Sequence, residues 1–285
     1  AVSLLRDIGG VAGNQQTSPD SQKGMDYVFT LDNLLKMLGI TLRLQARMPV
    51  VISGETGCGK SSLISCMCDI LEWPLDVLNV HSGLSYADIA AWVEERAKAC
   101  AERDLKDDER VSVILLDEIN ACSSVDLFKE IVCDGTVLGK PLPRKLRIVA
   151  ACNPYRMRKR VHAADDEAKA RVEEVGVVGL ASGELVYRVN PLHESLVDHV
   201  ADYGSLSRET EGMYISAMLK NLMRDEAAGM QSIDERSGNS GELQNVFAKC
   251  LSTAQESVRA IHGGERATVS LRDVNRCIKV KRMLV

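Results

Sequence analysis

A glycine-rich octapeptide constrains the fold of this chain more than any other feature. It follows the apolar run Val50–Ile52 and reads Gly54-Glu55-Thr56-Gly57-Cys58-Gly59-Lys60-Ser61, which matches the pattern G-x-x-x-x-G-K-[ST] at every fixed position. Glycines let the backbone curl until successive N–H groups point at one anion. A helix that starts at the motif's end adds its positive dipole end and its unpaired N–H groups. The motif therefore predicts a buried strand, a phosphate-binding loop and a helix in succession.

The side chains of this loop predict a nucleotide ligand. Lys60 can place its charge on the β- and γ-phosphates, and the Ser61 hydroxyl can bind Mg²⁺. We expect the nucleotide-binding residues to run from Gly54 to Ser62, with Cys58 acting as small bulk without a redox role. The alternative is a glycine-rich turn that binds nothing. From average residue usage, a chance match in a chain of this length has odds of about one in a hundred.

An acidic pair follows a second apolar run, Val111–Leu116. In open α/β sheets, ligands bind beyond the carboxyl ends of the strands, so Asp117 and Glu118 should face the phosphates. Asp117 is suited to hold Mg²⁺ through water, and Glu118 to polarise an attacking water. The alternative is a solvated pair of carboxylates that caps the next helix.

A third apolar run, Leu146–Cys152, ends in Asn153-Pro154. A neutral amide at a strand end can hydrogen-bond both a γ-phosphate and the attacking water without disturbing nearby carboxylates. Asn153 is therefore a candidate catalytic residue, and a turn-forming Asn before Pro is the alternative.

The order of apolar patterns predicts the architecture. Strand-like runs at 50–53, 75–80, 111–116, 146–152 and 185–189 alternate with helical patterns, and only helices are expected past about residue 190. Near-continuous apolar strands favour a parallel sheet covered on both faces. We expect a linker or mobile arm over residues 1–26, an α/β domain over 27–190 with a five-stranded parallel sheet, and a small all-α lid domain over 191–285.

Helix-capping signals accompany several of these elements. Thr30 should cap a helix whose apolar residues recur at helical spacing, namely Leu31, Leu34, Leu35, Leu38 and Leu42. Ser85 with Asp88, and Ser270 with Asp273, have the spacing of capping boxes. The run from Leu243 to Ile261 predicts a long amphipathic helix, and residues 228–241 predict a loop.

Composition excludes several functional classes. The formal net charge of −5 and an aromatic content of 4% argue against nucleic acid as the main partner. No apolar run approaches the ~20 residues of a membrane span, so we expect no transmembrane segment. The chain starts at Ala1 without a basic-then-apolar leader, which predicts no signal peptide and favours a piece of a larger protein. Nine scattered cysteines without a C-x-x-C pair predict a reducing, cytoplasmic setting.

Taken together, these motifs resemble those of the AAA+ ATPases. Residues 54–61 correspond to Walker A, Asp117-Glu118 to Walker B and Asn153 to sensor 1, while Asn120 in Asp-Glu-Ile-Asn resembles the dynein and midasin branch. The chain is still more similar to the mysterin family, giant ring-finger ubiquitin ligases with a dynein-like AAA+ core. The resembling stretches cover most of residues 27–285 and read GETGCGKSSLI, LLDEINACSSVDLFKEIVCDG, GKPLPRKLRIVAACNPYR, LVYRVNPLHESLVDHVADYG and VSLRDVNRCIKV.

The resemblance carries further expectations. It implies ATP and Mg²⁺ as ligands, a 5-1-4-3-2 strand order with the sensor strand between the two Walker strands, and Arg272 as a sensor 2 residue in the first turn of a lid helix. It also implies neighbouring AAA+ units in a ring within one polypeptide, and contact with the ubiquitin machinery through a ligase domain outside this chain, since no zinc-binding Cys/His spacing occurs here. The usual finger arginine before the last core strand is absent, which leaves Arg156, Arg158 and Arg188 as candidates.

Two functions remain open on the sequence. The first is an active ATPase, since Lys60, Ser61, Asp117, Glu118 and Asn153 are all present. The second is a nucleotide-binding structural module without turnover. Other P-loop classes fit less well, because the N-K-x-D of GTPases and the L-S-G-G-Q of ABC transporters are both missing.

Overall fold

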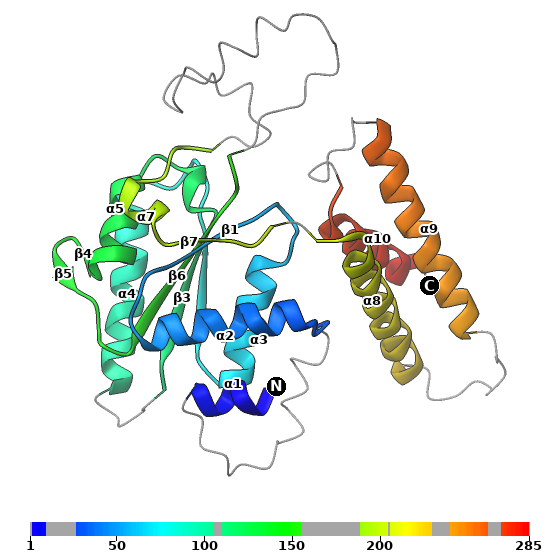
Figure 1. The fold of residues 1–285 in the computed structure, drawn as a ribbon, viewed down its shortest axis with the longest axis horizontal. Coiled ribbons are helices and arrows are strands. Elements are labelled where there is room, and N and C mark those ends of the chain that lie inside the picture. Colours follow the sequence, from blue (N-terminus) through cyan, green and yellow to red (C-terminus); the bar gives the residue numbers. More distant parts are fainter. Residues whose placement is uncertain are drawn as a thin grey trace, which may run out of the picture. The chain divides into compact units, whose positions relative to one another are not determined.

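Strand β3 (Ser112–Asp117) lies inside a parallel sheet, and all six of its residues are buried. It pairs in parallel with β2 (Leu75–Asn79) on one side and with β6 (Leu146–Cys152) on the other. Strand β6 also pairs with β1 (Val50–Ser53), which pairs with β7 (Val200–Asp202), again in parallel. The sheet order is β2-β3-β6-β1-β7 (Figure 1), which confirms the predicted five-stranded parallel sheet and its 5-1-4-3-2 order.

The computed structural model describes residues 2–9, 27–104, 110–155, 189–204, 206–229, 240–261 and 269–284. These residues belong to two units. The first contains the described residues up to Tyr203, apart from 27–29 and 55–58. The second contains 27–29, 55–58 and the described residues from Gly204 onward. The domain boundaries expected at residues 26 and 190 stay predictions.

Helices surround the sheet in the first unit (Figure 1). Its helical elements are α1 (Val2–Ile8), α2 (Leu31–Gln45), α3 (Lys60–Leu71), α4 (Tyr86–Asp104), η2 (Ile119–Ala121), α5 (Val125–Lys129), η3 (Glu130–Asp134) and α7 (Glu194–Val197). A short antiparallel hairpin joins β4 (Thr136–Val137) to β5 (Lys140–Pro141). The core between sheet and helices includes the fully buried side chains of Ile89, Ile114, Leu116 and Phe128.

The capping signals are confirmed. The Thr30 hydroxyl accepts a hydrogen bond from the Asn33 N–H at 3.1 Å, which starts α2. At the start of α4, the Ser85 N–H donates to the Asp88 carboxylate at 3.1 Å and the Asp88 N–H donates back to the Ser85 hydroxyl at 3.2 Å. The Ser85 hydroxyl also donates to the Asp88 carboxylate at 2.6 Å, and this bond, followed by the one from the Ser85 N–H, lowers the pKa of Asp88 below its usual value.

Two sequence-based expectations for the sheet unit need correction. Residues 185–188 of the predicted fifth strand lie outside the described residues, and Val189 is not in a strand. The fifth strand is β7, beyond the point where only helices were expected. Its three residues are half-buried or exposed, so they give no apolar run for a pattern to detect. In addition, α1 forms where no periodic structure was expected.

Helix α2 exists as predicted, but the leucines that predicted it are not its buried face. Leu31, Leu35 and Leu42 are 74%, 59% and 48% exposed. The buried residues are Asn33, Met37, Ile40, Thr41 and Leu44. Two of these are polar, and the Thr41 hydroxyl is satisfied locally because it donates to the Met37 carbonyl at 2.9 Å. Because the buried face of α2 includes polar residues, the spacing of apolar residues could not identify it.

The second unit contains three long helices, α8 (Arg208–Gly229), α9 (Ser240–Ile261) and α10 (Leu271–Leu284). They share a small core in which Ile215 and Leu219 of α8 meet Ala248 of α9 and Val274 and Ile278 of α10. The helix predicted from Leu243 to Ile261 is confirmed. The predicted loop at 228–241 is too long at both ends, because α8 includes Gly229 and α9 begins at Ser240; residues 230–239 lie outside the described residues.

We predict that Leu115→Ala lowers the free energy of unfolding by about 2–5 kcal/mol, because Leu115 is fully buried in the interior strand β3 and its loss leaves a cavity. The exposed Leu35→Ala is the matched control and should stay within about 0.5 kcal/mol of the unchanged chain. Urea unfolding followed by circular dichroism measures both. Equal losses in the two variants would contradict the assigned core.

Candidate nucleotide site at the carboxyl edge of the sheet

Three parallel strands bring the motif residues to one edge. Ser53, the last residue of β1, pairs in register with Cys152, the last residue of β6. On the other side of β6, Leu116 of β3 pairs with Ala150. The carboxyl ends of β1, β6 and β3 are therefore adjacent, and the residues that follow them, Gly54, Asn153 and Glu118, start from neighbouring points. This is the edge where α/β sheets bind ligands.

The loop after β1 has the backbone that its glycines predict. Gly57 and Gly59 have φ angles of +77° and +91°, in the left-handed region where a side chain is costly. Gly59 also occupies the N-cap position of α3, where no side chain caps the helix. The first-turn N–H groups of α3 are thus not occupied by a capping side chain, which suits an anion at this helix end.

The side chain of Lys60 bonds within this loop, and that of Ser61 connects the start of α3 to strand β3. Lys60 is only 6% exposed, and its ammonium donates to the Gly54 carbonyl at 2.6 Å. The Ser61 hydroxyl donates to the carboxylate of Asp117, the buried last residue of β3. Ser62 is exposed. The hydroxyl and the carboxylate proposed from sequence as metal ligands are therefore in direct contact.

Glu118 adopts an unusual backbone conformation at the point where β3 ends. Its φ of +60° and ψ of +40° are left-handed, which costs about 1–2 kcal/mol for a residue with a side chain. Its half-buried carboxylate makes no hydrogen bond or ion pair with the residues that the structure describes. Strained backbone of this kind concentrates at functional positions, so the geometry is consistent with a reactive carboxylate.

Asn120 joins the ends of β3 and β6, a role that the sequence analysis did not assign. Its side-chain amide donates to the Asn153 carbonyl at 2.8 Å, and its side-chain oxygen accepts the Asn153 N–H at 3.2 Å. The Asn120 carbonyl in turn accepts the Asn190 N–H at 2.7 Å. Asn120 is fully buried. The only sequence signal for this role was its place in the Asp-Glu-Ile-Asn motif.

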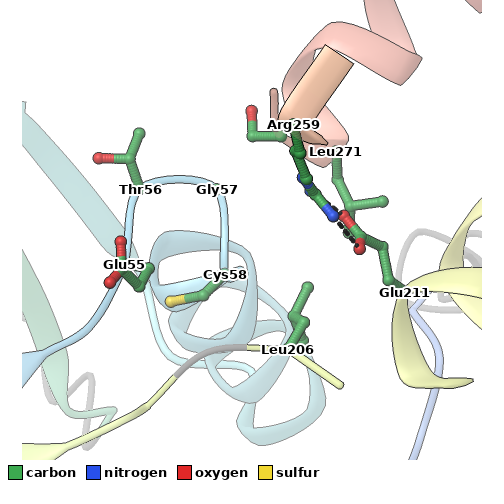
Figure 2. A pocket seen from close by; sticks show the side chains of 9 residues that line it. Glu55, Thr56, Gly57, Cys58, Leu206, Glu211, Arg259 and Leu271 are labelled. Atoms are coloured by element: carbon green, nitrogen blue, oxygen red, sulfur yellow. Dashed lines mark hydrogen bonds and ion pairs between the residues drawn. The ribbon is translucent and has the colours of Figure 1, made fainter. Parts of the chain in front are cut away.

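Residues 55–58, at the tip of the glycine-rich loop, belong to the second unit and line a small cavity of about 30 Å³ there (Figure 2). A side chain on Gly57 would place its Cβ 2.5 Å from the Cβ of Ser270, so this position also needs glycine for space. Figure 2 shows Arg259 directed at Glu211 on the far side of the cavity. Their two hydrogen bonds are 2.8 and 2.7 Å long and raise the pKa of Arg259.

The predicted capping box at the start of α10 is confirmed. The Ser270 N–H donates to the Asp273 carboxylate at 3.0 Å, and the Arg272 N–H donates to the Ser270 hydroxyl at 3.3 Å. Arg272 therefore lies in the first turn of α10, with an exposed side chain. The contact between the Arg272 side chain and a phosphate, which the resemblance implies, stays a prediction. The finger candidates Arg156, Arg158 and Arg188 lie outside the described residues.

The residues that the structure describes contain neither a preformed metal-binding cluster nor a membrane-spanning helix. Within these ranges, no three His, Cys, Asp or Glu side chains are grouped closely enough to hold a metal ion by themselves. In the same part of the chain, every helix is too short or too polar to cross a lipid bilayer.

Comparison with known proteins decides the family. A family model described as the RNF213 AAA domain matches residues 27–156. The chain is 37% identical over 270 residues to the E3 ubiquitin-protein ligase rnf213-beta of Danio rerio, and 34% identical over 283 residues to the E3 ubiquitin-protein ligase RNF213 of Homo sapiens. These alignments cover 89% and 94% of the chain. This chain is an AAA+ unit of the RNF213 (mysterin) family.

The chain corresponds to only a small part of its mysterin-family relatives. The chain spans 5% of the length of each of these two curated relatives. A more distant similarity links 76 residues, or 27% of the chain, to Midasin of Dictyostelium discoideum at 32% identity.

We predict that Asn120→Ala destabilises this mysterin-family unit by about 1–3 kcal/mol, because the buried Asn153 N–H and C=O each lose their partner. The Asn153 amide should also exchange with solvent faster, which ¹⁵N-resolved hydrogen exchange measures directly. Asn79→Ala, an exposed asparagine at the end of β2, is the control. Unchanged protection of the Asn153 amide would show that the two hydrogen bonds from Asn120 to Asn153, here called the Asn120 clamp, are absent in solution.

Proposed function

We propose that this chain binds ATP together with Mg²⁺ and hydrolyses it. The observation that carries the proposal is the contact between the Ser61 hydroxyl and the Asp117 carboxylate, next to a glycine loop and a helix N-terminus. Mg²⁺ prefers hard oxygen ligands and is held in nucleotide sites by one or two protein oxygens plus phosphates and water. A hydroxyl and a carboxylate on adjacent elements fit that requirement.

Each residue of the site then has a distinct role. The backbone N–H groups of residues 54–61 cradle the phosphates, and the Lys60 ammonium exchanges the Gly54 carbonyl for phosphate oxygens. Ser61 and Asp117 hold the magnesium ion, which neutralises charge that develops on the phosphates. The exposed Ser62 would be the last residue of the nucleotide-binding set.

Glu118 and Asn153, which follow the strands β3 and β6, carry out the hydrolytic step. No described residue makes a hydrogen bond or ion pair with the Glu118 carboxylate, so this group can accept a proton from an attacking water. Asn153 can orient the same water and the γ-phosphate through its amide. The clamp from Asn120 to the Asn153 main chain fixes the spacing between base and sensor.

The wider setting follows from the relatives. We propose that the chain works as one AAA+ unit among neighbouring units in a ring, within a single long polypeptide that also carries ubiquitin ligase activity, as the names of its relatives state for them. An arginine finger would come from Arg156, Arg158 or Arg188 and act on a neighbouring unit. All nine cysteines are free, which supports a reducing cytoplasmic location.

We predict that Glu118→Gln retains ATP affinity and lowers turnover by roughly 10²–10⁴-fold, because the amide cannot accept the proton of the attacking water. Isothermal titration measures the affinity, and phosphate release measures turnover. Glu102→Gln, on the exposed face of α4, is the charge-matched control. Binding without turnover in the unchanged chain would instead favour a nucleotide-binding structural module.

We predict that Arg272→Ala weakens ATP binding about tenfold, the loss expected for one charge-assisted contact with a phosphate. Arg276→Ala is the matched control, because Arg276 lies one turn further along α10 and pairs with Asp273 at 3.0 Å. Titration with ATP and with ADP measures both variants. Equal ATP affinities of the Arg272→Ala and Arg276→Ala variants would show that Arg272 does not contact the nucleotide.

A further inference from the structure

A second cavity lies in the sheet unit, at the opposite ends of the strands from the nucleotide site. It has a volume of about 180 Å³ and lies beside Pro49 and Leu146, at the amino ends of β1 and β6. We call it the arginine pocket, because Arg47, Arg144 and Arg147 are among its lining residues. None of the described residues that line it is acidic.

The interior of the arginine pocket is apolar and firmly packed. Leu44, Ile131, Val132 and Leu146 line it, and each is at most 7% exposed. An apolar cavity of about 150 Å³ is large enough to hold benzene. The arginine pocket can therefore accept one aromatic or branched aliphatic side chain.

The three arginines of the arginine pocket have no carboxylate partner among the residues that the structure describes. Arg147 is half-buried, and its guanidinium donates to the carbonyls of Leu44, Arg144 and Leu146. No carboxylate among the described residues pairs with any of the three. The acidic residues of the adjacent η3 have other partners, since Glu130 accepts from Thr136 and Gly139, and Asp134 pairs with Lys129. Burial and the charge of Arg47 lower the pKa of Arg147.

The backbone of Arg47 adopts the left-handed conformation that ends helix α2. The Met48 N–H donates to the Arg43 carbonyl at 2.9 Å and the Arg47 N–H to the Leu44 carbonyl at 3.2 Å, the two bonds of a Schellman motif. In this motif Arg47 takes the left-handed position, with φ of +56°, where glycine is strongly preferred. Glycine is therefore a substitution for Arg47 that the backbone accommodates without strain.

We propose that the arginine pocket binds an acidic peptide segment of a partner protein, with one aromatic or branched apolar side chain in the cavity and its neighbouring carboxylates on Arg47, Arg144 and Arg147. Charge complementarity selects this occupant, because a purely apolar segment would leave the three guanidiniums at the interface without a carboxylate partner. Aromatic side chains are also the common anchors of protein interfaces.

The smallest probe of this chemistry is phenylacetate, which joins an aromatic ring to a carboxylate. Its binding to the 285-residue chain can be followed by shifts of backbone NMR signals at the arginine pocket. Benzyl alcohol lacks the charge, acetate lacks the ring, and inorganic phosphate carries charge alone. We expect phenylacetate to bind at least about tenfold more tightly than each of them. Absence of binding, equal binding of benzyl alcohol, or equal binding of acetate or phosphate would overturn the proposal.

The decisive variant is Arg47→Gly, because it removes the charge while relieving the left-handed backbone. It should weaken phenylacetate binding about tenfold while the melting temperature stays the same or rises. Glu72→Gly is the matched control. Glu72 occupies the same left-handed Schellman position after α3, with φ of +56°, and the Trp73 and Glu72 N–H groups donate to the Cys68 and Asp69 carbonyls at 2.9 and 3.3 Å.

A peptide extends the test to the proposed partner class. A blocked Glu-Phe-Glu-Glu peptide should bind the unchanged chain and the Glu72→Gly variant alike, and should bind Arg47→Gly and Arg144→Ala about tenfold more weakly. A blocked Gln-Phe-Gln-Gln peptide should bind weakly to all four. Equal binding of the two peptides, or unchanged binding to Arg47→Gly, would contradict an acidic occupant.

Discussion

The hydrogen bond from the Ser61 hydroxyl to the Asp117 carboxylate is the contact on which the proposed site depends. It joins the start of α3 to the end of β3, two points 56 residues apart in sequence. The parallel sheet makes this contact possible, because β6 lies between β1 and β3 and all three end at one edge. Without that strand order, a glycine loop and an acidic pair would be two unrelated motifs.

The sequence predicted the sheet and this edge because their signals are local and strong. The loop at 54–61 matches its motif at four fixed positions, and the strand before the acidic pair is apolar from Val113 to Leu116. Strand order, in contrast, depends on long-range pairing that no local pattern encodes, and here it came from a family resemblance that the structure confirms.

The features that the sequence did not predict have identifiable physical causes. Strand β7 is three residues long and not buried, so it lacks an apolar run. The buried face of α2 contains the polar residues Asn33 and Thr41, so the spacing of the leucines predicted the helix but did not identify its buried face. Asn120 acts through main-chain partners at Asn153, and hydrogen bonds of this kind leave no spacing pattern in a sequence.

The two edges of the sheet differ in chemistry. The carboxyl edge combines a glycine loop, a helix N-terminus and carboxylates, which together suit a metal-bound polyphosphate. The amino edge presents three arginines around an apolar cavity, which suits a carboxylate attached to an apolar group. A nucleotide and a partner segment can therefore occupy one α/β unit without competing for the same side chains.

The most direct test of the central claim is the magnesium dependence of ATP affinity, measured by calorimetric titration with Mg²⁺ and with a chelator. We predict that Mg²⁺ tightens ATP binding to the unchanged chain, and that Ser61→Ala removes this gain while metal-free binding persists. ATP affinity that is undetectable, or that Mg²⁺ leaves unchanged in the unaltered chain, would contradict the account.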